Sequence, residues 1–90
     1  MKEELHIASV IVRSRPERLA DLKRAIADTP GAAIAAEDAA GRLIVTLESR
    51  SERAIAGHIE AFAAMPGVLA ATLVVHHAEP AGAEEGRVSP

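Results

Sequence analysis

The chain has 90 residues, which is the size of one domain with a small core, and 49% of them are apolar, chiefly alanine with Val, Ile and Leu. It contains no cysteine, which excludes disulfides, thiolate metal sites and cysteine nucleophiles, and its net charge of -3 argues against nucleic acid as the main partner. Its apolar stretches are too short to span a bilayer and its N-terminus lacks a secretory signal pattern, which predicts a cytoplasmic protein without membrane insertion.

The first half of the chain predicts a strand followed by a helix. Residues 6–14, HIASVIVRS, are short and β-branched, as strands are. Ser14 and Glu17 have the spacing of a capping box, and Pro16 suits the first helical turn. An apolar stripe at helical spacing follows, made of Leu19, Leu22 and Ile26.

A Pro-Gly pair at 30–31 ends this helix, and residues 32–38, AAIAAED, predict a second strand because glycines bound a segment too short for a helix. After a turn at 39–41, residues 42–48, RLIVTLE, give the clearest strand of the chain.

The second half repeats the pattern. Ser49 and Glu52 have capping-box spacing, and a Pro-Gly pair at 66–67 ends the second helix. Residues 68–77, VLAATLVVHH, predict the last strand. The apolar stripe of this helix consists of Ile55, Ile59 and Phe62.

Two consecutive β-α-β units predict an α+β, ferredoxin-like split βαβ fold, with a four-stranded antiparallel sheet and both helices on one face. Residues 1–78 would form this single domain. Residues 79–90 are rich in Pro, Gly and Glu, which predicts a disordered acidic tail.

Two helices on one side leave the other sheet face open, and strand alternation assigns side chains to the two faces. The expected core sets are Ala8, Val10 and Val12, then Leu43, Val45 and Leu47, then Leu69, Ala71, Leu73 and Val75. The expected outer sets are Ile7, Ser9, Ile11 and Arg13, then Ile44, Thr46 and Glu48, then Ala70, Thr72, Val74 and His76. This aliphatic and hydroxyl surface suits a basic amphipathic peptide or a homodimer that closes two open faces, and the pattern does not choose between them.

Neither catalytic nor metal-ligating residues emerge from the sequence. His76 and His77 are adjacent in a strand and point to opposite faces, so they do not chelate one metal easily, even with His6 nearby. The carboxylate pair Glu37-Asp38 lies near a turn, where nothing raises a pKa for general acid work. The expected site contains no metal and no cofactor.

Three stretches resemble the NapD family. HIASVIV at 6–12 resembles its opening strand with Ser9 at the characteristic serine, GRLIVTLE at 41–48 resembles its glycine-basic-aliphatic strand, and PGVLAATLVVHH at 66–77 resembles its closing strand. The resemblance covers residues 5 to 78. One departure is Val75, which stands where the family often has a tyrosine.

The resemblance implies a cytoplasmic chaperone that is not an enzyme. It would bind the twin-arginine signal peptide of the periplasmic nitrate reductase catalytic subunit, NapA, on its sheet side, and delay export until the molybdenum cofactor and iron–sulfur cluster are loaded. The chaperone would carry neither cofactor, and would be a monomer or weak homodimer. The expected peptide contacts are Ile7, Ser9, Ile11, Ile44, Thr46, Thr72, Val74 and His76, with Glu37, Asp38 and Glu48 as candidates to meet the arginines. The alternative is a small-ligand or metal-sensing regulatory module of the same fold, with the open face as a dimer interface.

Overall fold

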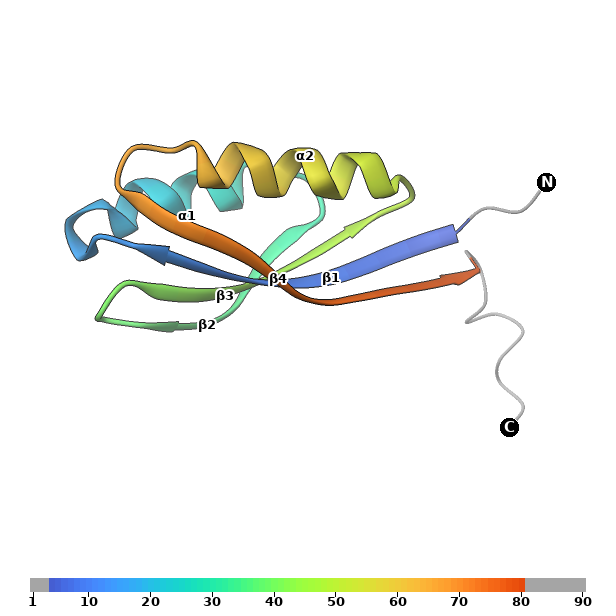
Figure 1. The fold of residues 1–90 in the computed structure, drawn as a ribbon, viewed down its shortest axis with the longest axis horizontal. Helices are drawn as coiled ribbons and strands as arrows, with labels where there is room; N and C mark the ends of the chain where they lie inside the picture. The colour runs from blue at the N-terminus through green and yellow to red at the C-terminus, as the bar shows by residue number, and fades with distance from the viewer. Residues whose placement is uncertain (1–3, 81–90) are drawn as a thin grey trace.

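Four strands and two helices account for most of residues 4–80, the part of the chain that the computed structural model describes (Figure 1). The elements are β1 (Glu4–Ser14), the short 3-10 turn η1 (Pro16–Arg18), α1 (Leu19–Ala27), β2 (Ala32–Asp38), β3 (Arg42–Ser49), α2 (Glu52–Ala63) and β4 (Val68–Pro80). None of the helices in this part of the chain is long and apolar enough to cross a membrane.

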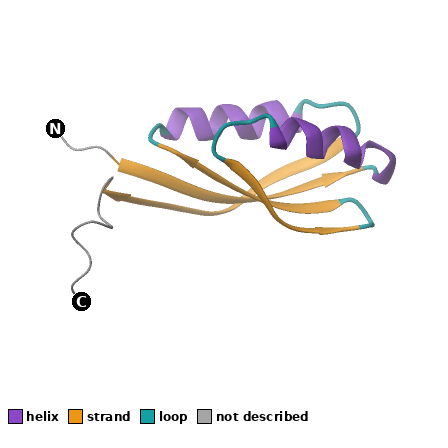
Figure 2. Cartoon of the chain, turned by 180° about the vertical axis from the view of Figure 1, so that it is seen from behind, coloured by secondary structure: helices purple, strands orange, loops and turns teal. Residues whose placement is uncertain are grey.

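The strands form one antiparallel sheet in the order β2-β3-β1-β4. Both helices cover the same face of this sheet, and within residues 4–80 no element lies on the opposite face (Figures 1 and 2). This arrangement confirms the predicted ferredoxin-like split βαβ fold. The most central strand pair is β1 and β3, which lie next to each other in uninterrupted register from His6 opposite Ser49 to Arg13 opposite Arg42.

The core lies between this central pair and the helices. Alternate residues of β1 and β3 point toward the helices and are fully buried, which confirms the predicted core sets of these two strands. The helices pack against these strand residues through Leu22 and Ile26, one turn apart in α1, and Ile55 and Phe62, two turns apart in α2. The buried set consists of Ala8, Val10, Val12, Leu22, Ile26, Leu43, Val45, Leu47, Ile55 and Phe62.

Both helices begin later than their serine motifs predict. Ser14 is still the last residue of β1, where its N–H donates to the carbonyl oxygen of Gly41 at 2.8 Å, and its hydroxyl donates to the carbonyl oxygen of Arg15. Ser49 still pairs with His6, so the N-cap of α2 is Ser51, whose hydroxyl oxygen accepts from the N–H of Ala54 at 3.0 Å. The two predicted capping boxes are therefore wrong because the sheet holds these serines in strands.

Strand β4 departs from simple alternation at two places. Val68 pairs with Ser14 and packs against the core, whereas Leu69, predicted to be in the core, is 64% exposed. Farther along, Leu73 pairs with Val10 and Val75 pairs with Ser9, which leaves Val74 as an extra residue in a β-bulge.

The bulge reverses the predicted faces of the residues that follow it. Side chains directly opposite each other in an antiparallel pair share a face. Val75 therefore lies on the open face with Ser9, and the core position predicted for it is wrong. His76 pairs with Ala8 and lies on the helix-side face, so its predicted place on the open face is also wrong.

Strands β1 and β4 extend past the helices as a two-stranded ribbon (Figure 1). Leu5 pairs with Glu79 and Glu4 pairs with Pro80, so β4 runs two residues past the predicted domain boundary at residue 78. The rest of the predicted tail, residues 81–90, lies outside the described residues.

Candidate functional site

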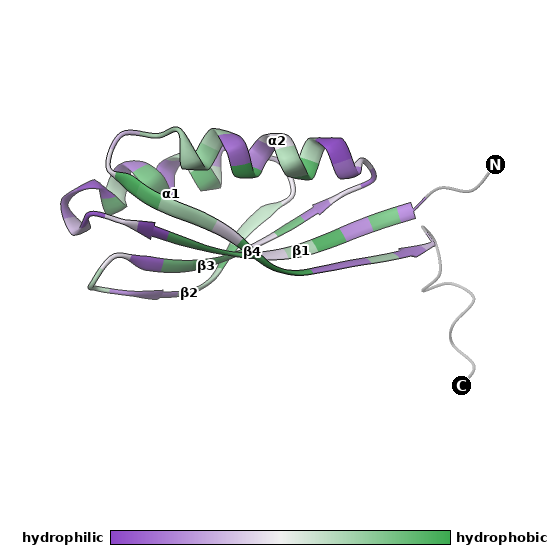
Figure 3. Ribbon diagram, in the orientation of Figure 1, coloured by the Kyte–Doolittle hydropathy of each residue, from purple (hydrophilic) through white to green (hydrophobic). Residues whose placement is uncertain are grey.

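The open face is the sheet surface that the helices do not cover, and the strand register defines its members. From β1 and β3 they are Ile7, Ser9, Ile11, Arg13, Arg42, Ile44, Thr46 and Glu48. From the outer strands β2 and β4 they are Ala33, Ala36, Asp38, Ala70, Thr72, Val75 and His77. Val74 has no partner in the register, so its predicted place on the open face stays a prediction. Hydrophobic stretches occupy the middle of β1 and β3, and hydrophilic residues stand toward their ends (Figure 3).

An aliphatic and hydroxyl strip forms the centre of the open face. Ile11 lies directly opposite Ile44, and Ser9 lies opposite Thr46. Ile44 is 40% exposed, and Ile7 and Ile11 are half-buried. On β4, Val75 is 53% exposed and widens this strip toward the sheet edge, next to the bulge residue Val74, which is 54% exposed. Such contiguous apolar exposure is typical of a contact surface.

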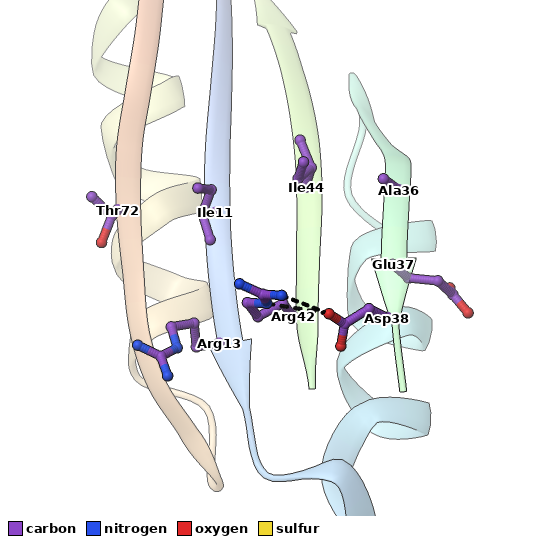
Figure 4. Close-up of a pocket in the computed structure, with 8 residues that line it drawn as sticks. All are labelled: Ile11, Arg13, Ala36, Glu37, Asp38, Arg42, Ile44 and Thr72. Atoms are coloured by element: carbon purple, nitrogen blue, oxygen red, sulfur yellow. Dashed lines mark hydrogen bonds and ion pairs between the residues drawn. The ribbon is translucent and has the colours of Figure 1, made fainter. Parts of the chain in front are cut away.

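Arginine side chains stand at one end of this strip, beside the turn that joins β2 to β3. A depression of about 670 Å³ opens there (Figure 4), and its lining residues are Ile11, Arg13, Ala36, Glu37, Asp38, Arg42, Ile44 and Thr72. Arg42 donates to one carboxylate oxygen of Asp38 through Nε at 3.2 Å and through Nη2 at 2.9 Å. This hydrogen bonding by Arg42, together with the N–H of Ala40, holds the pKa of Asp38 below its usual range.

A change of pH should test the Asp38–Arg42 pair. Because the pKa of Asp38 is lower in the folded state, the pair stabilises the protein above the unfolded-state pKa, and this stabilisation is lost as the pH falls through the folded value. Asp38→Asn should therefore be less stable than the wild type at pH 7, and the difference in urea midpoint should shrink below about pH 4. A difference that stays constant from pH 7 to about pH 3 contradicts this role of Asp38.

The three acidic residues predicted to meet arginines have different surroundings. The register shift between Ile34 and Ala36 changes the face of the residues after it, so Glu37 lies on the helix side of β2. There its carboxylate is 2.9 Å from Nζ of Lys23 in α1. In Figure 4 its side chain points away from the other labelled side chains. Asp38 is engaged by Arg42. Glu48 lies exposed on the open face and has no ion pair with any residue from 4 to 80.

The neighbouring residues His76 and His77 lie on opposite faces of the sheet. His76 lies on the helix-side face, where its Nε2 is 3.1 Å from Nδ1 of His6. The residue His6 is only 8% exposed. His77 pairs with Ile7 and therefore lies on the open face. Within residues 4–80, no three His, Cys, Asp or Glu side chains gather in a way that could hold a metal ion.

Removal of His76 should destabilise the fold while removal of its neighbour should not. His76→Ala leaves the buried Nδ1 of His6 without its hydrogen-bond partner, which should cost about 1–2 kcal/mol of unfolding free energy at pH 8. The matched control is His77→Ala, an exposed residue on the other face, which should stay within about 0.5 kcal/mol of the wild type. Urea unfolding of both variants checks this, and equal losses contradict it.

Sequence reasoning missed several members of the open face. Val75 and His77 come to this face through the bulge in β4, and no residue in VLAATLVVHH marks where the bulge lies. Arg42 was also left out, although its alternation with Ile44 places it on the same face as Arg13. The opposed arginines could have been found from the strand register alone.

Comparison with known proteins identifies the family of this chain. A family described as NapD protein matches residues 5–80. Chaperone NapD of Escherichia coli K12 is 33% identical over 85 residues, covering 93% of this chain and 98% of the relative. Chaperone NapD of Paracoccus pantotrophus is 40% identical over 81 residues, covering 90% of this chain and 71% of the relative.

A solved structure shares the fold as well. The solution structure of the E. coli Tat proofreading chaperone protein NapD has a TM-score of 0.72 and 32% identity to this chain, and the match covers 96% of this chain and 87% of the other. The relatives are named as chaperones, which is a non-enzymatic role. The residues, the fold and the relatives thus place this chain in the NapD family of chaperones.

Proposed function

We propose that this chaperone binds the twin-arginine signal peptide of the catalytic subunit of a periplasmic nitrate reductase, NapA, through its open face. Binding takes place in the cytoplasm and delays export until the cofactors of the enzyme are loaded. Membership of the NapD family and the proofreading role named for the solved relative support this proposal. The observation that carries it is the apolar strip around Ile11 and Ile44, which no helix or strand of residues 4–80 covers.

The chemistry of the open face suits such a peptide. A twin-arginine signal peptide joins a pair of arginines to an apolar stretch. The aliphatic side chains along β1 and β3 provide area for the apolar stretch, and burial of such area drives association. Ser9, Thr46 and Thr72 provide hydroxyl groups that tolerate water or hydrogen-bond to a peptide. Glu48 offers a carboxylate on the same face.

Calorimetric titration with a synthetic NapA signal peptide tests the proposal. The expected result is saturable binding of one peptide per chain at micromolar concentration or tighter. A peptide with both arginines replaced by glutamine should bind more weakly, because it loses its charge interactions with the chaperone. Absence of binding by the native peptide at micromolar concentration contradicts the proposal.

A homodimer through the open face is the competing use of the same surface. Sedimentation velocity of the free protein and of the protein with peptide distinguishes peptide binding from homodimer formation at this face. If the peptide occupies the open face, any weak homodimer formed by that face should dissociate as peptide is added. A dimer that persists at peptide saturation must use another surface.

A further inference from the structure

The two ends of the open face carry opposite charge. At the end where β3 begins, Arg13 and Arg42 face each other across the β1–β3 pair. Asp38 neutralises Arg42, and Arg13 is exposed with no ion-pair partner among residues 4–80. At the other end, Glu48 lies opposite Ile7 and is exposed. The face is therefore positive at Arg13 and negative at Glu48.

Backbone contacts fix both charged ends in place. The N–H of Glu48 donates to the carbonyl oxygen of Gly31 at 2.9 Å, which ties the negative end to the start of β2. The N–H of Ser14 donates to the carbonyl oxygen of Gly41 at 2.8 Å, which ties the residue after Arg13 to the β2–β3 turn. The charges are thus presented by rigid strand ends, which suits recognition of direction.

The apolar strip between these ends has the length of a short peptide segment. Arg13 lies six positions after Ile7 in β1, which is about 20 Å at the rise of a strand. A helix of about 13 residues, or an extended segment of about six residues, covers this distance. A signal peptide that lies along the strip therefore meets both ends, and its arginines meet only one of them.

We infer that the signal peptide binds in one direction, with its arginines at Glu48 and its apolar stretch running toward Arg13, parallel to β1. This inference rests on the proposed function. In this direction the arginines meet the exposed carboxylate, and Ile11 and Ile44 receive the apolar stretch. If the peptide is helical, its C-terminal carbonyls face Arg13, which the helix dipole favours. The reverse direction places two arginines against Arg13, and like charges at an interface oppose binding.

Paramagnetic labelling of the peptide tests the direction. The chaperone has no cysteine, so a nitroxide attached to a single cysteine at either end of the peptide labels the complex at one place only. A label at the arginine end should broaden the amide signals of Ile7 and Glu48 more than that of Arg13, and a label at the other end should reverse this order. The opposite pattern, or equal broadening, overturns the direction while binding itself still stands. Absence of binding overturns the proposed function and this inference with it.

A charge reversal tests the role of Glu48 in setting this direction. Glu48→Lys should weaken binding about tenfold at low salt, and the loss should shrink as salt is added. The matched control is Glu60→Lys, the same change at an exposed position of α2 on the covered side of the sheet, which should stay within about twofold of the wild type. Equal losses in the two variants overturn the assignment of Glu48 to the arginines.

Discussion

Replacement of Ile44 by glutamate is expected to weaken signal-peptide binding about thirtyfold or more, because the variant loses the burial of an isoleucine side chain and adds a carboxylate that must be desolvated. These effects together amount to at least about 2 kcal/mol, and 1.4 kcal/mol corresponds to about a tenfold change in affinity. Ile44 is the residue to choose because it lies in the central strip, opposite Ile11, and is 40% exposed. Calorimetric titration of the variant measures the loss.

The matched control for Ile44→Glu is Leu69→Glu. Leu69 is a larger exposed aliphatic target, at 64%, and it lies at the register shift where β4 begins, outside the strip around Ile11 and Ile44. This variant should bind the peptide within about twofold of the wild type, because its charge lies away from the contact surface. Thermal unfolding of both variants verifies that they are folded. Similar losses in both variants contradict binding at the open face.

Gly41→Ala is expected to destabilise the fold by about 3 kcal/mol, at the upper end of the cost of strained backbone. Gly41 has a φ of 109°, and an added Cβ would clash with the carbonyl oxygen of Ser14. The chain must shift to relieve this clash, which disturbs the hydrogen bond from Ser14 N–H to the Gly41 carbonyl. Urea unfolding measures the loss of stability.

The same substitution in α2 should have the opposite sign. Gly57 lies within α2, where an added Cβ would meet no atom within 4 Å. Alanine is the better helix former, so Gly57→Ala should stabilise the protein by about 0.5–1 kcal/mol. If Gly41→Ala leaves the free energy of unfolding unchanged or raises it as Gly57→Ala does, the account of the β2–β3 turn is wrong.

The sequence predicted the parts of the fold that regular alternation governs. Strands β1 and β3 pair without a register shift, so Ile7, Ser9, Ile11 and Arg13 lie on the open face as alternation requires. Strand β2 has the predicted bounds of residues 32 and 38, which glycines mark on either side. These predictions succeed because β-branched side chains favour strands, and turn residues favour turns, in the backbone next to them.

The missed parts of the site depend on long-range pairing. In β4 the extra residue is a valine next to another valine, so the sequence does not show which of Val74 and Val75 is left unpaired. The error passes to His76 and His77, whose faces are exchanged. In β2 a similar shift near Ala36 turns Glu37 toward Lys23. Bulges depend on how two strands meet, and one strand alone does not specify them.

The most direct test of peptide binding at the open face is a map of amide chemical-shift changes on addition of the NapA signal peptide. The largest changes should fall on β1 and β3, at Ile7, Ser9, Ile11, Ile44 and Thr46, with Val74 and Val75 beside them on β4. The exposed positions of α1 and α2, which cover the other face, should change little. If the changes cluster on the helices and spare the strip around Ile11 and Ile44, the peptide does not bind at the open face.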